Sequence, residues 1–166
     1  MLDRLPPEVL RAHKGKSFVG VTTAVAIFNR KGQIFLAQRS QNARDEHGRW
    51  DVCGGGLKWG TRIEDNIRRE MKEEFDAVSS SPLEFIGIRE AFRTDELGDE
   101  THWVATDYAV ILSEAESDGV KIMETDIFDD SGWFYMDKLP SPLHSQLHNQ
   151  YQTSLQNFLA KKSLKS

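Results

Sequence analysis

Cysteine is nearly absent from this sequence, since Cys53 is the only one among 166 residues. A single cysteine excludes an internal disulfide bond and a zinc site built from several cysteines. Long apolar runs are missing as well. No segment approaches the length of a transmembrane helix, and the N-terminus lacks the apolar stretch of a signal peptide. We therefore expect a cytoplasmic protein without a membrane partner.

Long basic runs are also missing, and the formal net charge is -5. This charge argues against a nucleic-acid polymer as the partner. It leaves a single nucleotide open, because a bound cation can neutralise its phosphates. The composition, with 39% hydrophobic and 28% charged residues, is ordinary for a globular protein. The length fits one domain, residues 1–166, with a substantial core.

The hydrophobic pattern predicts a mixed sheet with few helices, and its first two strands should form a hairpin. His144 and His148 fall four residues apart on the last predicted helix with no evident acidic partner, which favours packing or solvent exposure. The expected strands are residues 18–28, 34–38, 50–53, 83–93, 102–112 and 132–136, and the expected helices are residues 6–11, 62–75 and 143–161.

The most informative segment is a glycine triplet, residues 54–56, that leads into the helix at 62–75. At about 100° per residue, Glu70, Glu73 and Glu74 of this helix fall within roughly a third of its circumference. Glu70 and Glu74 border the core-facing stripe of Ile63, Ile67, Met71 and Phe75, so we expect both to be partly desolvated. Like charges this close repel one another, whereas a hard divalent cation with oxygen ligands would attract them. The pattern therefore predicts a metal site.

The same segment resembles the signature of the Nudix hydrolases, the MutT-like pyrophosphohydrolases. Gly55 stands at its first glycine, and residues 69–74, Arg-Glu-Met-Lys-Glu-Glu, match its Arg-Glu-x-x-x-Glu-Glu core. Residues 35–40 and 132–134 resemble the flanking strands. The resemblance covers about residues 18–160 and implies an α+β fold, a Nudix-type α/β/α sandwich with a mixed β-sheet.

Two signature positions differ from the family pattern. Thr61 stands where the family has its first glutamate, and Asp76 replaces the closing glycine. Asp76 is a mild change, because aspartate tolerates the left-handed conformation common after a helix. For Thr61 we expect a capping box with Glu64, worth about 1 kcal/mol, at the cost of weaker metal binding.

The resemblance implies a magnesium site, with manganese as an alternative cation. Arg69 should hold the Glu73 carboxylate in orientation, four residues along the helix. The general base stays open between Glu73 and Glu124, the latter in an acidic loop before the last strand, where Asp126, Asp129 and Asp130 are rival candidates. The expected metal ligands are Glu70, Glu74, Glu73 and the backbone carbonyl of Gly55.

The activity that the resemblance implies is hydrolysis of a nucleoside diphosphate linked to another moiety, by water attack on phosphorus. A nucleoside triphosphate or an ADP-ribose type compound would be the substrate, and a homodimer stays open. Arg39 and Lys58 are candidates for contacts with phosphates. Phe92 and Trp103 are candidates for stacking on a base.

Two alternative functions remain. Isopentenyl-diphosphate isomerases share this fold and use a cysteine just before the corresponding glycine, where Cys53 stands here. This chain lacks the histidine that usually follows in those enzymes, and it keeps the complete glutamate helix. The second alternative is a non-catalytic nucleotide-binding domain, and Thr61 is the one feature that supports it.

Overall fold

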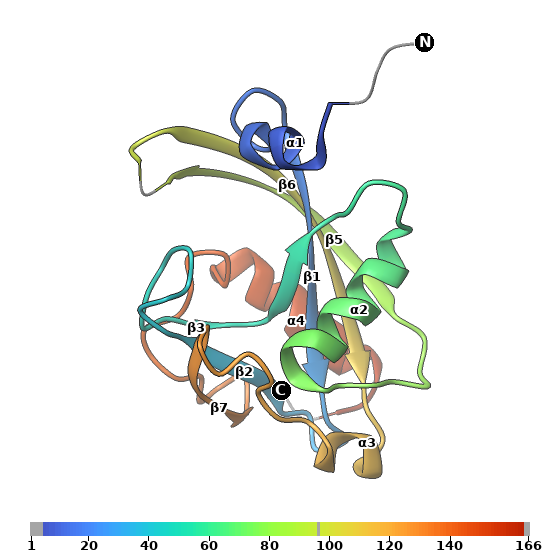
Figure 1. The fold of residues 1–166 in the computed structure, drawn as a ribbon. Helices are drawn as coiled ribbons and strands as arrows, with labels where there is room; N and C mark the ends of the chain where they lie inside the picture. The colour runs from blue at the N-terminus through green and yellow to red at the C-terminus, as the bar shows by residue number, and fades with distance from the viewer. Residues whose placement is uncertain (1–4, 96, 165–166) are drawn as a thin grey trace.

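The computed structural model describes residues 5–95 and 97–164, and in this part of the chain one seven-stranded mixed sheet forms the centre of the molecule (Figure 1). The elements in chain order are α1 (Pro7–His13), β1 (Gly20–Phe28), β2 (Ile34–Arg39), β3 (Trp50–Asp51), β4 (Cys53–Gly56), α2 (Ile63–Phe75), β5 (Glu84–Thr94), β6 (Glu100–Ile111), α3 (Glu114–Asp118), β7 (Phe128–Phe134) and α4 (Asn149–Lys161).

The strand order is β3-β2-β1-β6-β5, with β4 paired to β1 and β7 paired to β2. β1 and β6 run parallel, and the other pairs are antiparallel. The predicted hairpin of β1 and β2 is confirmed, with Phe28 opposite Ile34. β5 and β6 form a long ribbon whose connecting turn points away from α2 (Figure 1). Lys16 binds this turn through ion pairs with Asp95 and Asp99.

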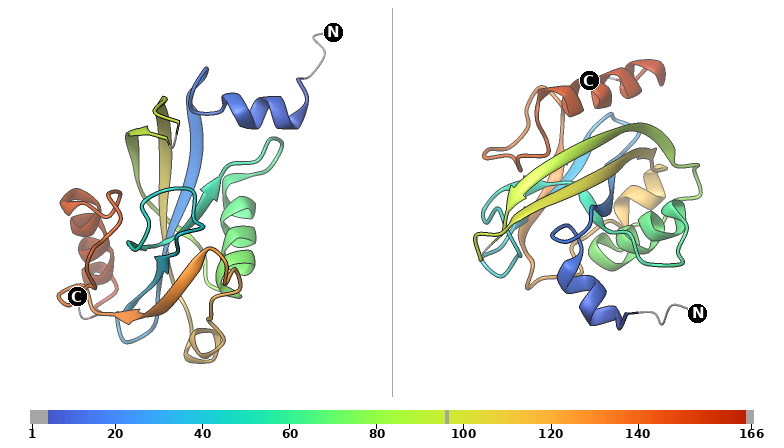
Figure 2. Two further views of the ribbon diagram at one scale, coloured as in Figure 1. Left: turned by 60° about the vertical axis from the view of Figure 1, so that its left-hand side comes forward. Right: turned by 90° about the horizontal axis from the view of Figure 1, so that it is seen from above.

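Helices α2 and α4 cover opposite faces of the sheet (Figure 2). Side chains alternate between the two faces of a strand. Val25 and Ile27 of β1 therefore pack with α2, while Ala26 and Phe28 pack with α4. This arrangement confirms the predicted α/β/α sandwich. None of the described helices is both long enough and apolar enough to span a membrane.

The prediction for the C-terminal helix is wrong at its start, because α4 begins at Asn149 and not at residue 143. Residues before it have another role: Leu143 forms a β-bridge with Trp50, and the His144 amide donates to the Trp50 carbonyl. The last strand also differs, since β7 spans Phe128–Phe134. The short helix α3 was not predicted, although Ser113 and Glu116 form a capping box at its start.

The predicted capping box at Thr61 is wrong. α2 begins at Ile63 with Arg62 as its N-cap, and no side chain caps the helix. Thr61 lies one residue too early and instead donates its backbone N–H to the Lys58 carbonyl, within a turn. Thr61 therefore gives α2 no cap that would offset the missing glutamate. At the other end, Asp76 adopts the left-handed conformation with φ of 50°, as expected.

Candidate active site

The glycines of β4 bring the backbone close to the acidic side of α2. β4 pairs with β1 so that Gly55 lies opposite Thr23, and α2 packs against β4. The Gly54 amide donates to Glu74 Oε2 at 3.2 Å. A Cβ atom on Gly55 would lie 2.5 Å from Glu70 Oε1, closer than real Cβ atoms come. The glycine at this position therefore makes room for a carboxylate.

Burial and repulsion between like charges raise the pKa values of two carboxylates near the glycines, Glu74 and Glu124. Burial, and then the charges of Glu70 and Glu124, raise the pKa of Glu74 to about 8. Burial also raises the pKa of Glu124, followed by the charges of Glu70, Asp126 and Glu73. Glu124, from the loop before β7, therefore shares one electrostatic environment with the glutamates of α2.

Arg69 holds two of the predicted carboxylates. It pairs with Glu70 at 2.5 Å and with Glu73, and it donates to Asn66 Oδ1 at 2.9 Å. Asn66 is fully buried and donates to Thr23 Oγ1, so it links Arg69 to the sheet. The sequence reasoning found Arg69 but missed Asn66, whose signal was a polar residue on the buried side of α2.

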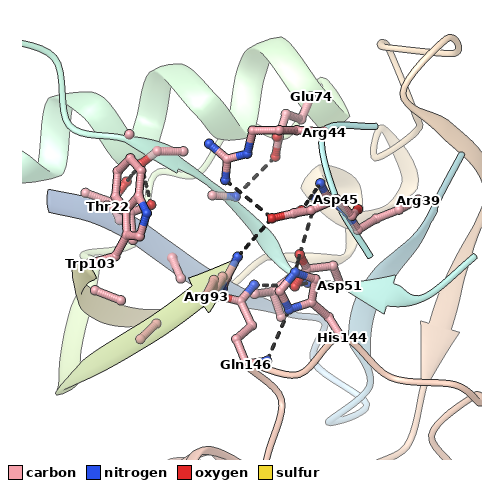
Figure 3. A pocket seen from close by; sticks show the side chains of 18 of the residues that line it. Thr22, Arg39, Arg44, Asp45, Asp51, Glu74, Arg93, Trp103, His144 and Gln146 are labelled. Carbon is pink, nitrogen blue, oxygen red and sulfur yellow. Dashed lines mark hydrogen bonds and ion pairs between the residues drawn. The ribbon is translucent and has the colours of Figure 1, made fainter. Parts of the chain in front are cut away.

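A cavity of about 290 Å³ opens beside the glycines (Figure 3). Glu74 and Glu124 line it, together with basic side chains from β2, β5 and the loop after β2. Trp103 of β6 forms part of its wall. The charged and polar side chains that line it include Arg39, Arg44, Asp45, Asp51, Glu74, Arg89, Arg93, Glu124, His144 and Gln146.

His144 lies beside two acidic residues, contrary to the prediction. Its ring nitrogens lie 3.6 Å from Asp51 and 3.8 Å from Glu46. The Gln146 amide donates to Nδ1 at 3.1 Å, which leaves the proton of a neutral imidazole on Nε2, facing Asp51. Burial lowers the pKa of His144, although Asp51 and Glu46 raise it. His144 therefore belongs to the polar lining of the cavity, next to Asp51 and Glu46.

The comparison with family models decides what this fold is. The model of the NUDIX domain matches residues 19–158. The chain belongs to the NUDIX family. This membership supports the prediction of a hydrolase that acts on pyrophosphate bonds, and members of the family generally use divalent metal ions.

Solved structures of NUDIX proteins resemble this one over most of their length. A MutT NUDIX hydrolase from Burkholderia pseudomallei is 27% identical, with a TM-score of 0.67, over 84% of this chain and 97% of that one. The NUDIX domain of Shewanella oneidensis NrtR, complexed with ADP ribose, is 17% identical, with a TM-score of 0.65 and coverages of 93% and 99%. A C. elegans Ap4A hydrolase is 15% identical, with a TM-score of 0.60 and coverages of 87% and 98%. No curated protein matches the chain.

The predicted substrate residues of this NUDIX domain divide into two groups. Arg39 and Trp103 line the cavity together with Gly55. Lys58 and Phe92 are not among its lining residues: Lys58 is exposed, and Phe92 is 73% exposed and stacks on His102. Phe92 and Trp103 come from neighbouring strands but face opposite sides of the ribbon, which the alternation of side chains along β5 explains.

Two further predictions depend on atoms that have other partners. The Gly55 carbonyl accepts hydrogen bonds from the Thr22 and Thr23 hydroxyls at 3.0 and 3.2 Å, which occupy both of its lone pairs. Cys53 is 1% exposed in the core under α2 and is not a lining residue of the cavity. Burial raises the pKa of its thiol further, so nothing here favours the isomerase alternative.

The acidic cluster fits a divalent cation in charge and in donor type. Carboxylate oxygens are the donors that magnesium prefers, and the half-buried Glu74 has no ion-pair partner among the described residues. The ligands are not assembled, however: in the described part of the chain, no three His, Cys, Asp or Glu side chains stand in an arrangement that holds a metal. Arg69 binds Glu70 and Glu73 instead.

Substitution of single glycines should separate the structural and functional roles of β4. In Gly54→Ala the new Cβ would lie 2.5 Å from the Thr23 carbonyl oxygen, and backbone cannot move aside cheaply. We expect a loss of about 1–3 kcal/mol in the free energy of unfolding. In Gly55→Ala the new Cβ would meet the flexible side chain of Glu70, which can move aside. We therefore expect a clear fall in kcat, because Glu70 is displaced, and little change in the free energy of unfolding. Urea unfolding and rate measurements test both.

Gly56→Ala is the matched control for stability, because the nearest atom to its Cβ would be Lys14 Nζ at 3.2 Å. Equal stability of the Gly54 and Gly56 variants would contradict this account of β4.

Proposed function

We propose that this NUDIX domain is a magnesium-dependent pyrophosphohydrolase, with manganese as an alternative cation. Its substrate is a nucleoside diphosphate linked to another moiety, of the nucleoside triphosphate or ADP-ribose type. The observation that carries the proposal is the cavity, whose lining contains both the carboxylates Glu74 and Glu124 and the guanidinium group of Arg39. Such a site suits a substrate whose phosphates lie between a cation and guanidinium groups.

Glu70 and Glu74 are the proposed ligands, with Glu73 as a third. The cation would neutralise the diphosphate and orient the attacking water. Arg69 would hold the Glu73 carboxylate in position, since the two side chains already pair on the exposed side of α2. The Gly55 carbonyl is the proposed neutral ligand, and the Thr22 and Thr23 hydroxyls that now approach it would turn to other acceptors.

Glu124 is the better candidate for the general base. It lines the cavity, whereas Glu73 does not and is paired with Arg69. A base must reach the proton that it removes, and its pKa should approach the working pH. The raised pKa of Glu124 is in that direction. Its carboxylate would take the proton of the water that attacks phosphorus.

Hydrolysis of a substrate panel tests the proposal. Nucleoside triphosphates, ADP-ribose, dinucleoside polyphosphates and nucleotide sugars are each incubated with the protein and magnesium, and released phosphate products are measured. We expect cleavage of at least one class and loss of cleavage after chelation with EDTA. Binding of a nucleotide without cleavage of any would favour the non-catalytic alternative.

A further inference from the structure

Three arginines that line the cavity meet at a single carboxylate. Asp45 lies in the loop after β2, and its two oxygens face Arg39, Arg44 and Arg93 (Figure 3). These arginines come from three separate segments: β2, the loop itself and β5. All three and Asp45 line the cavity. Burial alone would raise the pKa of Asp45, but the charges of Arg44, Arg39 and Arg93 hold it below its ordinary value. Asp45 is therefore a bound anion at this point.

Asp45 is a poor match for this arrangement. Only Arg39 binds it closely, at 2.8 Å, whereas Arg93 and Arg44 stand 3.3 and 3.7 Å away. Charge-assisted bonds between guanidinium and oxyanion groups are typically about 2.7–2.9 Å long. A carboxylate is planar and has two oxygens for the three guanidinium groups. A phosphate group offers more oxygens, directed tetrahedrally, and more charge.

The loop does not depend on the Asp45 carboxylate for its position. Arg39 Nε donates to the Asp45 backbone carbonyl at 2.8 Å. The Gly48 amide donates to the Arg39 carbonyl at 2.7 Å, and the Gln38 side chain donates to the Gly48 carbonyl at 3.0 Å. Glu46 binds both the amide and the hydroxyl of Ser145. Removal of the Asp45 charge should therefore leave the loop in place.

We propose that Arg39, Arg44 and Arg93 form a subsite for a phosphate group of the substrate, and that Asp45 occupies it until the substrate displaces it. The proposal rests on the proposed pyrophosphohydrolase function for the identity of the ligand. Arg44 also lies over the Trp103 ring, with 5.6 Å between the guanidinium carbon and the ring centroid. A displaced Arg44 or Asp45 would thus change the surroundings of Trp103.

The Asp45 carboxylate competes with a phosphate ligand, so it lowers the affinity for that ligand in proportion to the fraction of time that it occupies the subsite. Asp45→Asn removes the competing charge, and we expect it to tighten the binding of inorganic pyrophosphate by about 10-fold. Arg93→Gln and Arg44→Gln should each weaken the binding by about 3- to 10-fold. Titration calorimetry at one fixed ionic strength, in EDTA, measures this affinity without any contribution from a divalent cation.

Two control variants make the same charge changes elsewhere. Asp99→Asn removes an acid that pairs with Lys16 on the surface, and Arg30→Gln removes an exposed arginine in the turn between β1 and β2. Neither residue lines the cavity, and neither variant should change the affinity for pyrophosphate by more than about 2-fold. Arg44 is 70% exposed, so Arg44→Gln keeps the test usable if a more buried variant does not fold.

Unchanged or weaker binding in Asp45→Asn would overturn the proposal, because Asp45 would then orient the arginines instead of competing with the ligand. Unchanged binding in Arg44→Gln and Arg93→Gln would overturn it as well. The outcome is separable from the proposed function. If no substrate is cleaved in magnesium but the expected affinities are found in EDTA, the hydrolase proposal fails and the subsite stands.

Discussion

Glu70→Gln and Glu74→Gln are each expected to lower kcat for pyrophosphate-bond hydrolysis by about 100-fold or more. Both carboxylates lie against the β4 glycines, where Glu74 accepts the Gly54 amide and Glu70 fills the space above Gly55. Glutamine keeps the shape of the side chain but removes the charge that a divalent cation requires. Steady-state kinetics on the substrate found in the panel gives the measurement.

Glu64→Gln is the matched control, since Glu64 lies exposed on the first turn of the same helix. Its kcat should stay within about 2-fold of the unsubstituted protein. The ligand assignment is wrong if the Glu70 and Glu74 variants retain nearly full activity while circular dichroism shows an intact fold.

The second large effect concerns stability in the absence of divalent cations. Burial raises the pKa of Glu74 to about 8 in the folded protein, above its ordinary value of 4.5. At low pH the group is protonated in both the folded and unfolded chains, and its burial carries no charge penalty. Between about pH 4.5 and 8 the unfolded chain releases this proton while the folded chain retains it. The Glu74 contribution to the free energy of unfolding therefore falls as the pH rises through this window.

Glu74→Gln removes this titration, so the variant should gain stability relative to the unsubstituted protein as the pH rises. The gain can reach about 1.4 kcal/mol per pH unit inside the window. Urea unfolding of both proteins in EDTA at pH 5, 7 and 9 measures it, and the difference between them cancels the other titrating groups. A difference that does not vary with pH would show that Glu74 titrates normally. At pH 9, added magnesium should raise the Tm of the unsubstituted protein and leave that of the variant unchanged.

Local patterns were sufficient to predict the frame of the site. The stripe of Ile67, Met71 and Phe75 specified which side of α2 is buried, and this also placed Glu70 and Glu74 at the border of the core. The glycine triplet marked the segment that lies against the carboxylates, although its close approach to Glu70 was not predicted. The hydrophobic pattern predicted a mixed sheet with few helices, and the resemblance to Nudix hydrolases predicted the sandwich.

The set of charged residues that line the cavity could not be predicted from local patterns, because the residues come from distant segments of the chain. Asp45 and Arg93 are 48 positions apart, and Asp51 and Gln146 are 95 positions apart, yet each pair is in contact. Arg89 and Arg93, four positions apart on β5, did carry a signal for a shared face. The prediction of a cap at Thr61 was wrong because capping depends on which residue starts the helix. A capping-box motif in the sequence does not determine that residue.

The ribbon of β5 and β6 lies apart from α2 in the sequence, so residues that contact the substrate can change without changes to the proposed metal ligands. Its inner face contributes Arg93 and Trp103 to the wall of the cavity, while its connecting turn is bound to the rest of the chain through Lys16. The carboxylates of α2 and the glycines of β4 lie in another part of the sequence. Exchanging side chains on the inner face of the ribbon, such as Arg93 and Trp103, would therefore be a route to altered substrate choice that leaves the carboxylates of α2 in place.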